Sequence, residues 1–450
     1  MTKNMTEGSP AKLIFFFTLP LVAGNIFQQL YAFVDTLIVG RFLGVNALAA
    51  VGCTGALMFL MLGFVIGMTS GLSIYTGQRF GAKDAAGVRQ SVAACTVISL
   101  ATGLVLTLFG VLLCRELLIW TQTPAEILDG AYSFLSIVFG GIILFVLLQL
   151  QTNLIRALGN SKAPTVLLAV ALCINVILEP IAILILGWGI PGAALATVAS
   201  QAIGNVLCYI YIRKKLPELH THRADWHFDK EVYLGHLKIG LPMGFQSSII
   251  AIGSIILQVA INHFGPVAVA SYAAAQKVEA IALMPMMSFG MAMAAYTAQN
   301  YGAHKFHRIG QGVKKCAMMS VSFAIVVGIL LILFGTDIIE LFVGEGQDQV
   351  LRYGQQYLII NGSCYWILSL LFIFRYTLQG LGQSVVPTIA GVMELVMRTL
   401  AAIVLCAALG FTGACIANPM AWIGSCVPLA IAFFWTWRGF RRQHDFANGD

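Results

Sequence analysis

Charged side chains are scarce in this sequence of 450 residues. Asp, Glu, Lys and Arg together make up 10% of it, against roughly 25% in a typical soluble domain. Hydrophobic residues make up 59% and the mean hydropathy is +0.86. A chain with so few charges cannot cover its folded surface with groups that water solvates. The composition therefore argues against a soluble enzyme, a nucleic-acid binder and a disulfide-stapled secreted domain, and it predicts an integral membrane protein.

Signals for metal binding, catalysis and secretion are also missing. None of the ten cysteines forms a CxxC pair, and most lie within apolar segments, where small packing residues are expected. The polar start, MTKNMTEGSPAK, leads into an apolar run without a small-residue cleavage pattern, so no cleavable signal peptide is expected. No set of nucleophile, metal-ligand or cofactor-binding residues stands out, and an enzyme is the least favoured class.

The apolar segments are long enough to cross a bilayer as helices, which takes ~20 residues each. They lack the alternating pattern of membrane strands. Twelve such segments are predicted, at about 13–40, 47–75, 90–113, 131–151, 164–186, 190–212, 238–262, 268–298, 312–334, 352–375, 386–408 and 411–436.

The basic residues predict the orientation in the membrane. Of the 26 Lys and Arg residues, 21 fall in even-numbered loops or at the two ends of the chain, and Arg375 is counted among them. Cytoplasmic loops of membrane proteins carry an excess of Lys and Arg. The pattern predicts a multi-pass protein of the cell membrane with both termini in the cytoplasm.

Three motifs recur later in the chain at a nearly constant offset. Leu19-Pro20 returns as Leu241-Pro242, GQRFGAKD at 77–84 as AQNYGAHK at 298–305, and LIRALGNSKAPT at 154–165 as TLQGLGQSVVPT at 377–388. Each copy holds six predicted spans, so both copies face the same way, as in the halves of many transporters. The predicted fold is an all-α membrane protein of twelve helices in two pseudo-symmetric six-helix lobes.

The repeat also sets the predicted lobe boundaries. They are 1–212 for the first lobe and 238–450 for the second, joined by a polar cytoplasmic linker at 213–237. Two such lobes predict a binding cavity between them and transport by alternating access.

Two acids inside the predicted spans of the first lobe are the main candidates for function. A charge at mid-bilayer costs at least ~2.5–3.5 kcal/mol. Asp35 follows Pro20 at the same spacing as Glu179 follows Pro164, and Asn175 lies one turn before Glu179. Both helices are predicted to start in the cytoplasm, so the two carboxyl groups are expected at similar depth. There they can share a proton or hold a small cation such as Na⁺.

The alternative is that these acids only pack helices together through hydrogen bonds. The second copy argues against it, because the repeat offsets place Leu257 and Ala402 at the equivalent positions. A need of the shared fold would have kept an acid in both copies. Ion coupling is therefore expected in the first lobe alone.

The second lobe carries different charges. Glu394 and Arg398 are spaced i,i+4 and predict a structural ion pair. Lys277 and Glu279 are spaced i,i+2 and point to different sides of their helix, so a structural or a substrate-binding role is open for both. The candidate residues of a substrate cavity are Gln28, Gln246, Lys277, Glu279 and Met287, the last from a helix rich in methionine, which suits varied ligands or ordinary packing.

These features together resemble the MATE (multidrug and toxic compound extrusion) family over essentially the whole chain. The resemblance rests on the duplicated twelve-span layout, on Pro20 before FVDTLIVG, on NVILEP at 175–180, and on the TGQRFGAKD and AQNYGAHK motifs. It implies a secondary-active exporter that moves drug-like, usually cationic, molecules outward in exchange for H⁺ or Na⁺. It further implies a monomer with no nucleic-acid partner and no cofactor besides the coupling ion.

The resemblance also assigns roles to single residues. Pro20 matches the kink proline and hinge of the first helix, Thr197 a sixth-helix hydroxyl of the ion site, and Asn153 a fourth-helix asparagine. Glu179 departs from the aspartate common in the family. Gln246 lies near a position where another branch has glutamate, and the tenth span has no acid, which favours the DinF-like branch over the NorM-like one.

Two rival functions remain from the sequence. A flippase for lipid-linked precursors, from the same superfamily, is the nearest alternative, although such proteins commonly have about fourteen spans and a basic cavity. A channel or receptor is disfavoured by the repeat and by the acids confined to one lobe.

Overall fold

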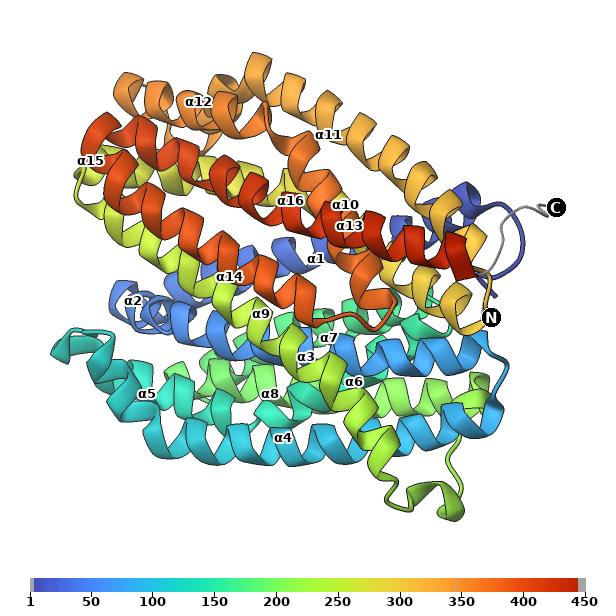
Figure 1. The fold of residues 1–450 in the computed structure, drawn as a ribbon. Coiled ribbons are helices and arrows are strands. Elements are labelled where there is room, and N and C mark those ends of the chain that lie inside the picture. Colours follow the sequence, from blue (N-terminus) through green and yellow to red (C-terminus); the bar gives the residue numbers. More distant parts are fainter. Residues whose placement is uncertain (1–3, 345, 444–450) are drawn as a thin grey trace. The chain divides into compact units, whose positions relative to one another are not determined.

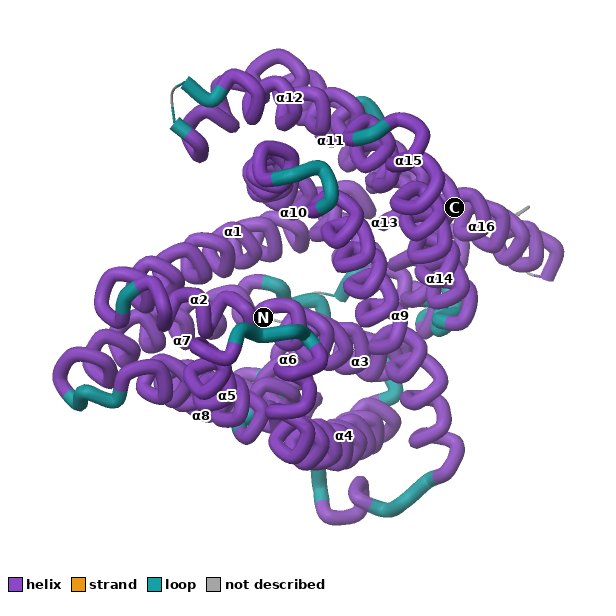
Figure 2. The backbone as a smooth tube through the Cα atoms, turned by 90° about the vertical axis from the view of Figure 1, so that its left-hand side faces the viewer, coloured by secondary structure: helices purple, strands orange, loops and turns teal. Residues whose placement is uncertain are grey.

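The computed structural model describes residues 4–344 and 346–443, and this part of the chain contains helices and loops but no strand (Figures 1 and 2). The helices of the first repeat, with two π- or 3₁₀-turns, are α1 (Pro10–Leu43), α2 (Val45–Cys53), α3 (Gly55–Gly81), α4 (Ala85–Trp120), α5 (Ala125–Gly140), α6 (Ile142–Ala157), α7 (Lys162–Pro180), η1 (Ile181–Ile185), α8 (Gly189–Lys215) and η2 (Pro217–Leu219). After η3 (Arg223–Trp226) follow α9 (Lys230–Asn262), α10 (Pro266–Gly302), α11 (Phe306–Val343), α12 (Asp348–Gly362), α13 (Tyr365–Gly380), α14 (Val385–Leu400), η4 (Ala401–Leu405), α15 (Cys406–Leu409) and α16 (Phe411–Gln443).

Ten of these helical segments are long and apolar enough to cross a membrane singly, and two bent helix pairs bring the number to twelve in the described chain. Each of the twelve predicted segments corresponds to one of these spans. The predicted all-helical membrane fold is thus confirmed.

The two bent spans occupy equivalent places in the two repeats. α5 and α6 meet at 48° around Gly141, and α12 and α13 meet at 50°. The sequence predicted one apolar span at each place, at 131–151 and 352–375. A Cβ on Gly141 would lie 2.6 Å from the Val198 side chain of α8, and one on Gly328 of α11 would lie 2.5 Å from the Gly362 carbonyl. Both bends therefore occur where another helix packs directly against the backbone.

Contacts between residues divide the chain into two compact units. Unit 1 contains Asn4 and Leu19–Gly244, and unit 2 contains Met5–Thr18 and the chain from Phe245 onward. The units divide between Gly244 and Phe245, and the predicted lobe boundaries at 1–212 and 238–450 stay predictions. The predicted linker region is partly helical, since α9 begins at Lys230.

The segment before α1 belongs to unit 2 because its backbone is hydrogen-bonded there. The Met5 amide donates to Gln299 Oε1 at 2.9 Å, and Asn300 Nδ2 donates to the Met5 carbonyl at 3.1 Å. Arg308 Nη2 donates to the Gly8 carbonyl at 2.9 Å. The first turns of α1 are therefore attached to one repeat and the rest of the helix to the other.

Candidate functional site

α1 and α7 run together in unit 1 and position the two acids. Thr165 Oγ1 donates to the carbonyl of Pro20 at 3.0 Å. Gly24 allows close contact at this point, because a Cβ there would lie 3.1 Å from Thr165 Cγ2. From the shared level of Pro20 and Thr165, Asp35 and Glu179 follow at almost the same spacing along α1 and α7. At 1.5 Å per residue both acids lie about 21–22 Å further on.

The carboxyl groups of Asp35 and Glu179 interact with each other. Glu179 is 0% exposed, and apart from the carboxyl group of Asp35 no described residue offers a hydrogen bond to its carboxyl oxygens. Asp35 accepts one from Tyr31, whose hydroxyl lies 3.4 Å from Oδ1. Two ionised carboxylates in contact repel each other, whereas one proton or one small cation between them removes the repulsion.

Asn175 lies one helical turn before Glu179 on α7 and carries a further buried oxygen. Its Nδ2 lies 3.3 Å from both Thr197 Oγ1 and Ser200 Oγ of α8, and it donates to these hydroxyls. Its Oδ1 has no hydrogen-bond partner among the described residues, and the side chain is 1% exposed. Three buried oxygens without donors, two from Glu179 and one from Asn175, are what a proton or an oxygen-liganded cation requires.

Tyr31 and Ser200 were not predicted from the sequence. Tyr31 is spaced i,i+4 from Asp35, so the helical period could have found it. Nothing distinguished Ser200 from the other serines of the spans.

The structure places other predicted residues away from this group. Asn153 Nδ2 donates to Thr69 Oγ1 at 3.1 Å, and Asn153 Oδ1 accepts from Arg156 at 3.2 Å, so its hydrogen bonds join α6 to α3. Gln28 is exposed on α1. Their roles in ion coupling and substrate binding stay predictions.

Unit 2 buries a set of charges between α13, α14 and α16. Glu394 Oε1 accepts from Arg398 at 3.0 Å, which is the predicted ion pair, and Oε2 accepts from Arg375 at 2.6 Å. Arg375 was predicted to lie in a cytoplasmic loop, and this is wrong. It lies within α13 and is 6% exposed, because the buried carboxylate of Glu394 pairs with it.

The same network continues to α10 through hydroxyl and amide groups. Arg398 Nε donates to Asn418 Oδ1 at 3.1 Å, and Asn418 Nδ2 donates to the Tyr357 hydroxyl at 2.9 Å. Glu279 accepts from Tyr357 at 2.5 Å and from Tyr365 at 3.3 Å. Both carboxyl oxygens of each acid in this network thus have donors, unlike those of Glu179.

The remaining candidates for a substrate cavity divide into buried and exposed residues. Gln246 is 3% exposed, donates to the Pro387 carbonyl at 2.6 Å and accepts from Gln379 at 2.8 Å. Glu279 is 5% exposed, whereas Lys277 and Met287 are exposed on the same helix. The two charges of α10 therefore point to different sides, as predicted.

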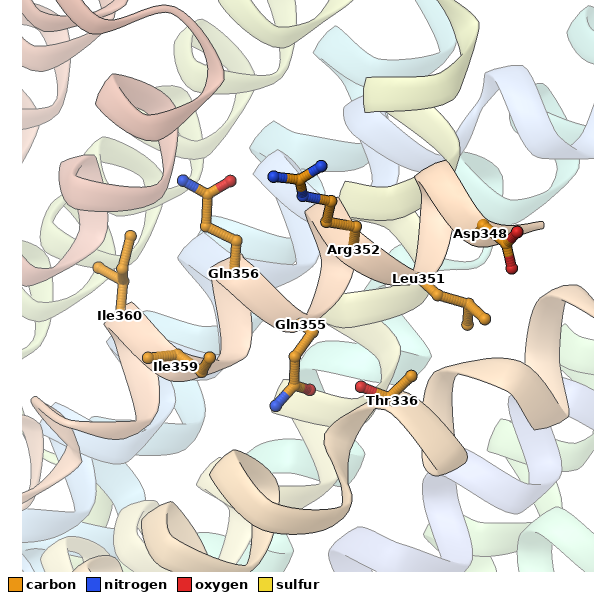
Figure 3. A pocket seen from close by; sticks show the side chains of 8 residues that line it. All are labelled: Thr336, Asp348, Leu351, Arg352, Gln355, Gln356, Ile359 and Ile360. Atoms are coloured by element: carbon orange, nitrogen blue, oxygen red, sulfur yellow. The ribbon is translucent and has the colours of Figure 1, made fainter.

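A cavity of about 510 Å³ lies between α11 and α12 of unit 2 and contains none of the predicted residues. Figure 3 shows Arg352 and Gln356 projecting from one side of α12, while Gln355 points toward Thr336 of α11. Gln355 donates to the Ile332 carbonyl and Gln356 to Thr412, so both amide nitrogens already have acceptors in the protein.

Comparison with known proteins gives concordant results. The MatE family model matches residues 20–181 and 242–406, and the two matches start at the two prolines of the predicted repeat. The probable multidrug resistance protein YoeA of Bacillus subtilis is 29% identical over 402 residues, covering 88% of this chain and 86% of that protein. YpnP, also a probable multidrug resistance protein of Bacillus subtilis, is 26% identical over 381 residues, with 84% of each chain covered.

The fold is also found among solved structures. The crystal structure of MATE in complex with MaL6 has a TM-score of 0.90 to this chain at 21% identity. The match covers 98% of this chain and 100% of that one. At this identity the likeness shows the shared fold.

Proposed function

Because this chain belongs to the MATE family, we propose that it is a multidrug efflux transporter that exports cationic or amphipathic small molecules in exchange for inward-moving H⁺ or Na⁺. The proposal includes alternating access and cytoplasmic termini in the plasma membrane. Names of relatives such as YoeA and YpnP support the substrate class, and the site in unit 1 supports ion coupling.

One observation carries the coupling proposal. Glu179 is fully buried beside Asp35, and apart from the carboxyl group of Asp35 no described residue offers a hydrogen bond to its carboxyl oxygens. Leaving a buried polar group without a partner is costly. The pair therefore binds a proton or Na⁺, and Asn175 Oδ1 and the two carboxyl groups are the ligands this chain offers to such an ion.

Ion binding acts on α1. Asp35 is part of this helix, and Pro20 at its other end lacks the amide hydrogen that would continue the backbone ladder. An ion that binds one conformation of α1 more tightly shifts the protein toward that conformation. Substrate release outward is the step we assign to the ion-bound form. With apolar residues at the equivalent positions of unit 2, coupling through unit 1 agrees with the DinF-like branch.

The test is dye efflux from vesicles with the pH and Na⁺ gradients imposed independently. Asp35→Asn abolishes efflux under both gradients, and Asp129→Asn is the matched control, because Asp129 undergoes the same chemical change at an exposed carboxylate, 87% accessible. Efflux retained by Asp35→Asn would refute the assignment.

Pairing of the two acids has its own signature. If Asp35 and Glu179 bind one ion together, Glu179→Gln alone should also abolish efflux under both gradients, because the two acids then act as a unit. Efflux at the unaltered rate in Glu179→Gln would contradict a shared site. Counterflow of a labelled lipid-linked precursor in place of a dye would instead favour the flippase.

A further inference from the structure

A cavity of about 850 Å³ opens on unit 2 between α11, α13 and α16, outside both charged sites. It lies at the first turns of α11 and the last turns of α16, and Figure 1 shows these two helix ends at the same end of unit 2. Its volume is within the range of ~300–1,000 Å³ typical of sites for small molecules. Nothing in the proposed transport mechanism uses it.

The wall of the cavity is aromatic. Phe433 and Trp437 of α16 are stacked with ring centroids 6.2 Å apart, and Phe374 of α13 lies 5.3 Å from Phe433. Gly310 makes this arrangement possible, because a Cβ there would overlap the Trp437 ring. The indole therefore lies directly on the α11 backbone and forms a continuous apolar surface with its neighbours.

The rim of the cavity is basic. Lys314 of α11 and Arg441 of α16 line it and are exposed, and within residues 4–344 and 346–443 neither has an ion-pair partner. His307 also lines it, and none of its described lining residues is acidic. An anion is therefore the complementary ligand, and two cations next to apolar rings suit a ligand with one charged and one apolar part.

The surroundings are those of a lipid-facing surface. At the cavity, Phe434 is 54% and Trp435 is 78% exposed on a helix that is long and apolar enough to cross a membrane. Such side chains face acyl chains in a bilayer, and Lys, Arg and Trp gather where the chains end. Basic pockets between spanning helices on the cytoplasmic side bind lipid headgroups.

We propose that this cavity is a binding site for an anionic phospholipid of the leaflet that lies next to the chain termini. Lys314 and Arg441 bind the phosphate, and an acyl chain lies along Phe374, Phe433 and Phe434. This proposal does not depend on the ion site in unit 1, and it does not depend on the identity of the transported substrate.

The test uses the full-length protein in detergent, titrated with phosphatidylglycerol and followed by native mass spectrometry. Phosphatidylethanolamine with the same acyl chains is the control lipid, because its headgroup is zwitterionic and carries no net charge. The variant Lys314→Gln/Arg441→Gln should weaken phosphatidylglycerol binding roughly 25-fold, since each basic residue at a membrane surface contributes about fivefold. Lys315→Gln/Arg442→Gln is the matched control, because it removes the same charge from neighbouring exposed positions that do not line the cavity.

Three results would overturn the proposal. They are equal weakening in the two double variants, equal binding of both lipids to the unaltered protein, and competition by soluble glycerol phosphate as strong as by the lipid, which would indicate a site for a soluble anion.

Phe434→Ala tests the aromatic wall of the cavity without changing charge. It should weaken binding of long-chain phosphatidylglycerol and leave the short-chain lipid unaffected, and an equal effect on both would refute the placement of the acyl chain.

Discussion

Two isosteric substitutions in the buried network of unit 2 should have very different effects on stability. Glu394→Gln and Glu279→Gln make the same chemical change at positions that are 3% and 5% exposed. The difference lies in the partners. Glu394 accepts from two arginines, whereas Glu279 accepts from the hydroxyls of Tyr357 and Tyr365.

The partners differ in whether they can accept a hydrogen bond from the new amide. A guanidinium has only hydrogen-bond donors, so the NH2 group that Glu394→Gln introduces would face a second donor. The substitution would also leave the two buried arginines without a counter-charge. Breaking a buried ion pair in this way costs about 3–5 kcal/mol of the free energy of unfolding. A tyrosine hydroxyl can turn and accept from an amide. Glu279→Gln should therefore cost about 1 kcal/mol, the net value of an ordinary hydrogen bond.

The assay is the apparent Tm of the purified protein in detergent. At roughly 2–4 °C per kcal/mol for units of about 200 residues, Glu394→Gln lowers the Tm by about 6–20 °C and Glu279→Gln by about 2–4 °C. Adding Arg375→Gln to Glu394→Gln removes one unpaired cation and should recover part of the loss. Equal Tm changes in the two single variants, or no recovery in the double variant, would refute the account of the network.

Two further predictions concern helix packing and the N-terminal segment. Gly71→Ala should destabilise unit 1 by about 1–3 kcal/mol, because the added Cβ would lie 2.7 Å from Gly240 Cα. Gly52→Ala is the control, since a Cβ at this position meets open space and should leave the Tm unchanged. Equal Tm changes in the two variants would contradict the contact between Gly71 and Gly240. Arg308→Ala removes the hydrogen bond to the Gly8 carbonyl. Amide hydrogen exchange at residues 5–8 should therefore accelerate while exchange in α16 stays the same. Unchanged exchange at residues 5–8 would show that Arg308 is not needed to hold this segment.

Much of the fold could be predicted because its signals are local. Twelve apolar runs give twelve spans, and the repeated motifs around Pro20 and Pro242 reveal the duplication. The proximity of Asp35 and Glu179 also follows from chain geometry, since both lie about the same number of residues from a common starting level. A helix rises by a constant amount per residue, so equal spacing gives equal depth.

The features that could not be predicted depend on partners far away in the chain. Arg375 looks like a loop residue near the GLGQ motif at 380–383 of the second repeat, and only the carboxylate of Glu394 on the next helix explains its burial. The bends at Gly141 and Gly362 depend on which helix packs against them. Attachment of Met5 to unit 2 likewise depends on Gln299, which is distant in the sequence.

The hydrogen bonds around the buried acids distinguish their roles better than their position in the membrane does. Glu279 and Glu394 each have donors on both oxygens, so the protein itself stabilises their charge and needs no ion there. Glu179 is at least as deeply buried and has no donor from any described residue, only the carboxyl of Asp35 beside it. Ionising both acids of this pair is costly unless a proton or a small cation binds between them. The Asp35–Glu179 pair is therefore the place where an external ion can change the relative stability of two conformations. This favours ion coupling in unit 1.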